Sequence, residues 1–260
     1  MVRSIEDIVQ VENLPSSITA LLSDEKIKNY TGMGKRASRF LDAFKITYDK
    51  PAIERIVSCY AFWLKVVDDE MDEGDPEIIE RVLAHLDFPD NWLEDSYTAS
   101  IYATEEFKKQ INPAIYDEVI PQLYQLYKAV KEERSGRNIQ AYIERRKDVG
   151  NLTGEIMYQL IEPKLATSSQ KARNSFMKLC EVGCLFDSCV DIMDDYENLV
   201  LGFKPKMTDR MMLYASTMKE TATMFVSYPE LLPEFVDIAK RNARYLIQVF
   251  IPSKKTKDGG

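Results

Sequence analysis

Hydrophobic residues recur at intervals of three and four positions over long stretches of the chain. In "AIERIVSCYAFWLKVVDDEMDE", residues 52–73, apolar side chains stand at positions 53, 56, 57, 60, 64, 67 and 71. In "ARNSFMKLCEVGCLFDSCVDIMDDY", residues 172–196, they stand at positions 176, 179, 180 and 184. This spacing gathers the apolar side chains on one face of a helix. The pattern therefore predicts two long amphipathic helices.

Further segments show the same helical pattern, and alternating strand patterns are scarce. These segments span residues 95–111, 116–134, 138–161, 209–228 and 233–251. Gly and Pro, which interrupt helices, gather between the segments, as in "DEGDP", "DFPDN" and "GFKPK". We predict an all-α fold: a single-domain helical bundle over residues 1–252, followed by a disordered polar tail at residues 253–260.

The charge balance argues against nucleic acid as the main partner. The chain carries 34 Lys and Arg residues against 42 Asp and Glu residues, which gives a formal net charge of −8. Phosphate backbones attract basic surfaces, so an acidic protein matches them poorly. A small anionic substrate held by a local group of cations remains compatible with this balance.

The four cysteines give no sign of a disulfide framework or a zinc site. Cys59, Cys180, Cys184 and Cys189 stand inside apolar runs without paired spacing. We interpret them as small buried side chains in a reducing compartment, and we expect a cytoplasmic location. Since no apolar run reaches the length of a membrane-spanning helix, we expect no transmembrane segment.

Two acidic runs continue the apolar faces of the two long helices. The stripe through positions 57, 60 and 64 leads to Asp68 and Asp72, and the stripe through 176, 180 and 184 leads to Asp187, Asp191 and Asp195. Residues three and four apart share a helix face, so we expect these carboxylates to point into the bundle. A solvated helix end explains either run alone, whereas the agreement of the two runs favours the inward placement.

Carboxylates that point inward need compensation, because an unpaired buried charge is costly. Oxygen ligands without nitrogen or sulfur suit a hard cation such as Mg²⁺, which substrate phosphates commonly complete. A di- or triphosphate ligand is therefore implied. The single histidine, His85, argues against a di-iron bundle, which needs paired Glu-x-x-His motifs, and against zinc or histidine-dependent hydrolases.

At these acidic residues the chain resembles the class I isoprenoid synthases. The stretch "DDEMD", residues 68–72, is similar to their DDxxD motif. Its surroundings, "CYAFWLKVVDDEMDEGDP", are most similar to the squalene and phytoene synthase branch, which typically has arginine where Lys65 stands. The second run has the spacing of the terpene cyclase motif NDxxSxxxE in an all-aspartate form: Asp187, Asp191 and Asp195.

Two more segments extend the resemblance. "AYIERRKDVGNLTGEIMYQLIE", residues 141–162, is similar to the terpene cyclase helix that carries a diphosphate-sensing arginine and a helix break. By this resemblance Arg145 is the sensor, and the linker and break are formed by Asp148, Val149 and Gly150. "ARYL" is similar to a late Arg-Tyr pair of the cyclases, here Arg244 and Tyr245.

The resemblance implies an all-α bundle of the class I isoprenoid synthase type with a central apolar active-site cavity. It also implies a terpene synthase that ionises an allylic prenyl diphosphate of C15 or C20 with Mg²⁺ and cyclises the carbocation. Three Mg²⁺ ions would be held by Asp68 and Asp72 on one side and by Asp187, Asp191 and Asp195 on the other. The diphosphate would contact Lys65, Arg145, Arg244 and Tyr245.

Other activities stay open at this point. The resemblance also covers enzymes that couple or transfer prenyl groups, as squalene and phytoene synthases and prenyltransferases do. Outside this superfamily, an all-α Mg²⁺-dependent nucleotide pyrophosphohydrolase also uses inward carboxylates, and a non-catalytic helical binding protein is the plainest alternative. A homodimer is compatible with the resemblance, because dimers are common among these enzymes.

Overall fold

The computed structural model describes residues 32–73, 77–87, 99–134, 136–197 and 201–233, and every regular element in them is helical. The prediction of an all-α fold is confirmed for this part of the chain. The α-helices are α4 (Met33–Ala43), α5 (Lys50–Glu73), α6 (Ile78–Asp87), α7 (Ala99–Lys108), α8 (Tyr116–Arg134), α9 (Ile139–Ile161), α10 (Gln170–Glu197) and α11 (Met207–Ser227). Three short 3₁₀ turns join them: η1 (Pro113–Ile115), η2 (Glu162–Lys164) and η3 (Pro229–Leu231).

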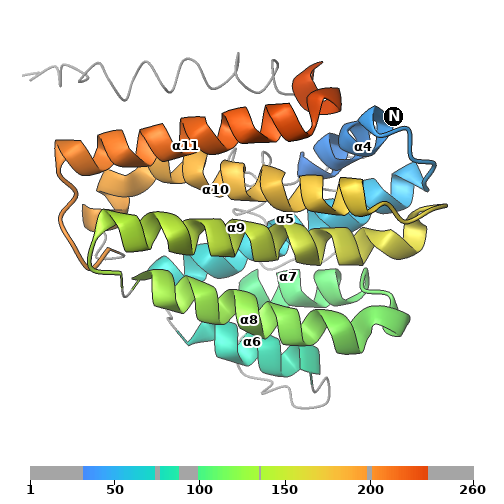
Figure 1. Ribbon diagram of the computed structural model, residues 1–260. Coiled ribbons are helices and arrows are strands. Elements are labelled where there is room, and N and C mark those ends of the chain that lie inside the picture. The colour runs from blue at the N-terminus through green and yellow to red at the C-terminus, as the bar shows by residue number, and fades with distance from the viewer. Residues whose placement is uncertain (1–31, 74–76, 88–98, 135, 198–200, 234–260) are drawn as a thin grey trace, which may run out of the picture.

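The helices form a layered bundle in which the longest ones lie side by side. In Figure 1, α11, α10, α9, α8 and α6 follow one another from top to bottom, and α5 and α7 lie behind this row. Helix α5 packs against α4, α7 and α9, so it is enclosed on several sides. None of the helices in the described ranges is both long enough and apolar enough to cross a membrane.

Helices α9 and α10 approach each other closely because two glycines of α9 face α10. A Cβ atom on Gly150 would lie 2.5 Å from the Cα of Glu181, and one on Gly154 would lie 2.6 Å from the Cα of Met177. Such distances are far below van der Waals contact, so only glycine allows this spacing. Because α9 is continuous from Ile139 to Ile161, the helix break expected at Asp148–Gly150 is not found, and Gly150 serves helix packing instead.

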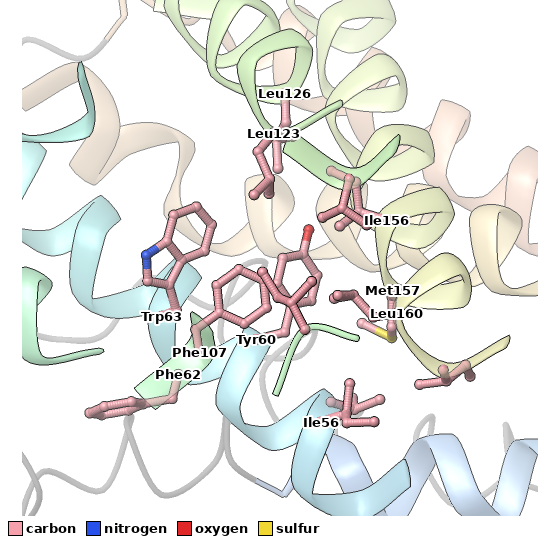
Figure 2. Close-up of a cluster of buried hydrophobic side chains, with 14 of the residues drawn as sticks. Ile56, Tyr60, Phe62, Trp63, Phe107, Leu123, Leu126, Ile156, Met157 and Leu160 are labelled. Carbon is pink, nitrogen blue, oxygen red and sulfur yellow. The ribbon is translucent and has the colours of Figure 1, made fainter. Parts of the chain in front are cut away.

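The interior between α5, α7, α8 and α9 is filled by large apolar side chains. Figure 2 shows Tyr60, Trp63 and Phe107 together, with Leu123 and Ile156 beside them. The rings of Trp63 and Phe107 stack at 5.1 Å between centroids, and the Trp63 Nε1 donates to Thr104 Oγ1 at 2.9 Å. The central apolar cavity expected from the sequence is not confirmed, because these side chains occupy the region beside α5.

A groove of about 450 Å³ opens elsewhere, between α8 and α9. Its walls carry charged and polar side chains from both helices, and its floor is apolar; the lining includes Lys128, Glu132, Asp148, Asn151, Leu152, Glu155 and Met177. Its acids have basic partners, since Arg145 pairs with Glu132 and Arg173 pairs with Glu155. The groove is therefore close to neutral overall.

Candidate functional site

Helices α5 and α10 run parallel, and this brings their acidic ends to the same end of the bundle. The phenol of Tyr60 on α5 lies near the thiols of Cys180 and Cys184 on α10, and the Lys65 ammonium lies near Asp187. Moving from Tyr60 to Lys65 thus corresponds to moving from Cys180 to Asp187. One further turn along each helix brings the aspartates after Lys65 to the level of Asp191.

Lys65 is the cation at the centre of this arrangement. Its Nζ donates to Asp69 Oδ1, and the side chain is mostly buried, with 14% exposed. Burial alone lowers the pKa of Lys65, but the hydrogen bond that Lys65 donates to Asp69 and the charges of Asp69, Asp68 and Asp187 outweigh it and raise the pKa. Lys65 therefore stays protonated and lies between acids of two different helices.

Arg146 adds a second cation from α9. Its Nε donates to Ser188 Oγ at 2.7 Å, and its Nη2 donates to the carbonyl of Cys184 at 3.3 Å. The same Nη2 lies 3.5 Å from Asp187 Oδ2. The Arg146 side chain is 18% exposed, so the guanidinium is held in a half-buried position directly beside the second acidic run.

The structure places Arg145, the residue that the resemblance suggested as a diphosphate sensor, on a different side of α9. The side chain is 44% exposed, and its Nη1 lies 2.7 Å from Glu132 Oε2 on α8 and 4.0 Å from Asp148 Oδ2. The arginine that faces α10 is Arg146. The sequence contained a signal for this, because Arg146 falls in helical register with the buried residues Ile139 and Ile143, whereas Arg145 does not.

The first acidic run lies at the surface end of α5. Asp68, which was expected on the buried face, is exposed, and the buried positions in this part of α5 are Val66, Val67 and Met71. Asp69, the neighbour that pairs with Lys65, is partly buried with 34% of its side chain exposed. Asp72 lies within α5, but its side chain is outside the described part of the structure.

The second acidic run follows the edge of α10. Asp187 is exposed, with 52% of its side chain accessible, and Asp191 and Asp195 are partly buried. Tyr142 on α9 donates its hydroxyl hydrogen bond to Asp195 Oδ2 at 3.3 Å. The three aspartates thus share one edge of the helix, as their spacing predicted, but this edge borders solvent.

The donor chemistry of this region fits a magnesium ion. Among the side chains that the structure describes, no group of three or more His, Cys, Asp or Glu residues is already assembled around a single point. The two runs nevertheless offer carboxylate oxygens, which Mg²⁺ prefers. Cations that can bind an anion lie beside them: Lys65 near acids of both runs, and Arg146 next to Asp187. A metal–diphosphate group bound at this end would draw on both runs.

A buried hydroxyl lies below the charged groups, toward the middle of the bundle. Tyr60 is fully buried, and its hydroxyl oxygen has no hydrogen-bond partner of good geometry. Burial raises the pKa of this phenol well above its ordinary value, and the neighbouring thiols of Cys180 and Cys184 add to the rise. The Tyr60 hydroxyl is therefore a neutral dipole at physiological pH. Sequence reasoning treated Tyr60 as a core residue and had no signal for a fully buried hydroxyl at this position.

The late pair Arg244 and Tyr245 lies outside the described residues. Comparison with other proteins adds no assignment, since no protein-family model, curated protein or solved structure matches the chain.

Proposed function

We propose that the protein is a class I terpene synthase, which ionises an allylic prenyl diphosphate of C15 or C20 and cyclises the resulting carbocation. The observation that supports this most directly is the parallel course of α5 and α10, with Lys65 close to Asp69, Asp68 and Asp187. Two acidic runs that are far apart in sequence thereby lie near the same cation, Lys65. Such a pairing of carboxylates and cations suits a metal–diphosphate ligand better than it suits a neutral or cationic one.

In this proposal the carboxylates of the two runs hold Mg²⁺. Asp68 and Asp72 would do so from α5, and the α10 ligands would be Asp187, Asp191 and Asp195. The bound metal, as a Lewis acid, would supply stabilisation of the negative charge that develops on the departing diphosphate. Because the described acids are partly exposed and spread along two helices, they would draw together when the ligand binds.

Lys65 and Arg146 would bind the diphosphate oxygens. In the structure both cations donate hydrogen bonds to protein acceptors: Lys65 to Asp69, and Arg146 to Ser188 and the carbonyl of Cys184. The arginine fork can exchange its weak 3.5 Å contact with Asp187 for a bidentate contact with a diphosphate. Lys65, a compact charge on a flexible stem, needs only to rotate away from Asp69.

The hydrocarbon part of the substrate would lie beneath the charged groups, against the buried aromatic residues of α5. Tyr60 and Trp63 lie within two turns of Lys65, and the faces of such rings stabilise a carbocation by about 0.5–2 kcal/mol each. Side chains in this region would have to rearrange to admit the chain. A prenyl diphosphate should therefore change the packing of Tyr60 and Trp63, which tryptophan fluorescence can report.

The decisive experiment is a panel of C10 to C25 prenyl diphosphates and nucleoside triphosphates, with and without Mg²⁺, read by mass spectrometry. Mg²⁺-dependent release of diphosphate with a cyclic hydrocarbon or alcohol as product supports the proposal. A product with two joined prenyl chains identifies a coupling enzyme at the same site. Pyrophosphate released only from nucleotides contradicts the isoprenoid assignment, and turnover of none of these substrates contradicts both.

Variants on the two helices complete this experiment. Asp191→Asn keeps the shape of its side chain and Lys65→Gln keeps a polar side chain, while each variant removes one charge from its helix. Both should lower diphosphate release by at least about tenfold, the effect expected when one charged partner of a phosphate is lost. Lys219→Gln, on the exposed side of α11, removes a charge far from the site and serves as the matched control. Equal activity in all of these variants would remove the site assignment.

A further inference from the structure

Helix α11 is covered on one face only by the described structure, and its opposite, outer face is apolar. The covered face packs on α10 and is rather polar: its buried residues are Leu213, Thr217, Glu220, Thr221 and Met224. For example, the Oγ1 of Thr217 forms a hydrogen bond with Cys189 Sγ at 3.3 Å, in which either atom can be the donor. The opposite face is the more apolar one, although α11 lies at the outer edge of the row of helices in Figure 1.

The outer face forms one continuous stripe along the whole helix. Its members are spaced by three or four residues, and we call them the outer apolar stripe: Met207, Met211, Ala215, Met218, Ala222 and Val226. Met207 and Met211 are each 60% exposed, and Val226 is 85% exposed. A continuous apolar stripe along an exposed helix face usually marks a surface that another element covers. The outer apolar stripe therefore needs a cover.

The continuation of the chain provides a segment of suitable length at the right place. The described chain leaves α11 through η3, whose Leu231 is buried, and it ends at Pro233 beside the last turn of α11. The next residues, 234–251, could form a helix of about 27 Å, at about 1.5 Å per residue. On the same basis the 21 residues of α11 span about 31 Å.

The pattern of this segment matches a helix that covers one apolar face. Seven of its apolar residues recur at helical spacing on one arc: Phe235, Ile238, Ala239, Tyr245, Leu246, Val249 and Phe250. Asn242 also falls on this arc, and Val236, Ile247 and Ile251 fall outside it. The opposite arc carries Asp237, Lys240, Arg241, Arg244 and Gln248. A segment with one apolar and one charged arc is suited to lie on a surface helix with its charges toward solvent.

We propose that residues 234–251 fold back as an antiparallel amphipathic helix and cover the outer apolar stripe of α11. Starting from the turn at η3, this register brings Phe235 near Val226. Further along, it brings Ile238 and Ala239 near Ala222, and it brings Tyr245 and Leu246 near Ala215. Large side chains of one helix then meet the small residues of the other, which favours close packing. The register leaves Arg244 on the charged arc, away from α11 and from the aspartates of α10. The proposal does not depend on the proposed enzymatic function.

Disulfide trapping in the full-length protein tests this register. Ala215→Cys with Leu246→Cys should form an intrachain disulfide under mild oxidation, detected as a mass loss on intact-protein mass spectrometry. Ala215→Cys with Gln248→Cys, which uses the charged arc, is the matched control and should not. Equal trapping in both pairs, or trapping in neither, overturns the proposal. A disulfide-linked dimer from Ala215→Cys alone also overturns it, because the cover would then be a second copy of the chain.

Limited trypsin digestion gives a second test that needs no engineered bond. The segment contains cleavage sites after Lys240, Arg241 and Arg244. We expect these sites to be protected in the native protein, and we expect Ala222→Arg on the stripe to raise the cleavage rate by at least about tenfold. Thr223→Arg, exposed beside the stripe, is the control and should leave the rate unchanged. Immediate cleavage of the native protein at these sites contradicts the cover.

Discussion

Arg146 on α9 donates from Nε to Ser188 Oγ on α10 at 2.7 Å, and this bond holds its guanidinium next to Asp187. The serine is buried, so its hydroxyl has few other partners, and it also donates to the carbonyl of Cys184 at 2.9 Å. The two residues fix the direction of the arginine fork. They explain why the neighbouring Arg145, which turns toward Glu132, cannot take the same position.

Replacing Arg146 should therefore affect function far more than replacing Arg145. Arg146→Ala removes a guanidinium beside Asp187, and we expect a loss in kcat/KM of about 10- to 100-fold with the prenyl diphosphate that the panel identifies. Arg145→Ala removes an exposed ion pair, and the change should stay within about threefold. The measurement is steady-state diphosphate release by both variants. A larger loss in Arg145→Ala would restore the role that the sequence resemblance assigned to it.

Stability should respond in opposite directions to alanine at two glycines of the helix pair. Gly150→Ala places a Cβ 2.5 Å from the Cα of Glu181, so α9 and α10 must move apart, at a cost of about 1–3 kcal/mol. Gly183, on α10, has open space around the position of a Cβ and is exposed, so Gly183→Ala should stabilise by about 0.5–1 kcal/mol. Chemical denaturation measures both changes. A neutral Gly150→Ala would contradict the close approach of the two helices.

The helices could be predicted from the sequence, because the spacing of apolar residues along a helix depends only on residues that are close together in the chain. The same pattern placed Asp68 on the wrong face of α5, since this residue is exposed and not buried. Helix α5 is buried on nearly all sides from Ile56 to Trp63, since it packs against α4, α7 and α9. A helix that is apolar all round has no single stripe, so a stripe extended from it toward Asp68 has no fixed phase.

The helix break that was expected at Gly150, but is not found, shows a second limit. A glycine inside a helical pattern is compatible with a break or with close packing, and only the position of the neighbouring helix separates the two. Gly150 and Gly154 stand four residues apart and face the backbone of α10. The sequence of α9 alone does not show that another helix lies against these two glycines. In contrast, Arg146 could have been preferred over Arg145 from the sequence, because it shares a helix face with Ile139 and Ile143.

The native thiols should react slowly with disulfide reagents in the folded protein. Burial raises the pKa of Cys59 to about 12, and it also raises the pKa of Cys180 and Cys189. Because the thiolate is the reactive form, these thiols are almost fully protonated at neutral pH. We expect Ellman's reagent to label them at least about tenfold faster after denaturation than before. Rapid labelling of Cys59 in the native protein would contradict its placement, and slow labelling makes the engineered disulfides easier to interpret.

A buried group of four charges between α9, α10 and α11 should make stability depend on pH. Glu220 Oε1 lies 2.9 Å from Lys147 Nζ, and Lys178 Nζ pairs with both Glu220 and Glu181. Burial raises the pKa of Glu220, but the hydrogen bonds and charges of Lys178 and Lys147 outweigh it and lower the pKa below its ordinary value of 4.5. In the same way the acids raise the pKa of Lys147 and Lys178 against the effect of burial.

The sign of the pH effect follows from these directions. A carboxyl whose pKa is lowered on folding contributes stability that is present above its ordinary pKa and is lost as pH falls through the lowered value. Protonation of Glu220 should thus weaken the protein as pH falls below about 4.5, the ordinary pKa of the carboxyl. The raised pKa of the two lysines contributes stability below their ordinary value of 10.5, which is lost as pH rises through the raised value. Glu220→Gln should cost about 1–3 kcal/mol at pH 7, because it leaves two partly buried ammonium groups with fewer acceptors.

The same substitution isolates this contribution. Denaturation of the native protein and of Glu220→Gln at a series of pH values from 3 to 7 gives the difference in unfolding free energy at each pH. The difference should shrink as pH falls below about 4.5, since the native protein then loses the charge that the variant already lacks. Glu144→Gln, whose carboxylate lies 3.5 Å from Lys147 on the exposed side, serves as the control and should show a small difference at every pH. A difference for Glu220→Gln that stays constant down to pH 3 would show that the charge of Glu220 does not stabilise the junction of the three helices.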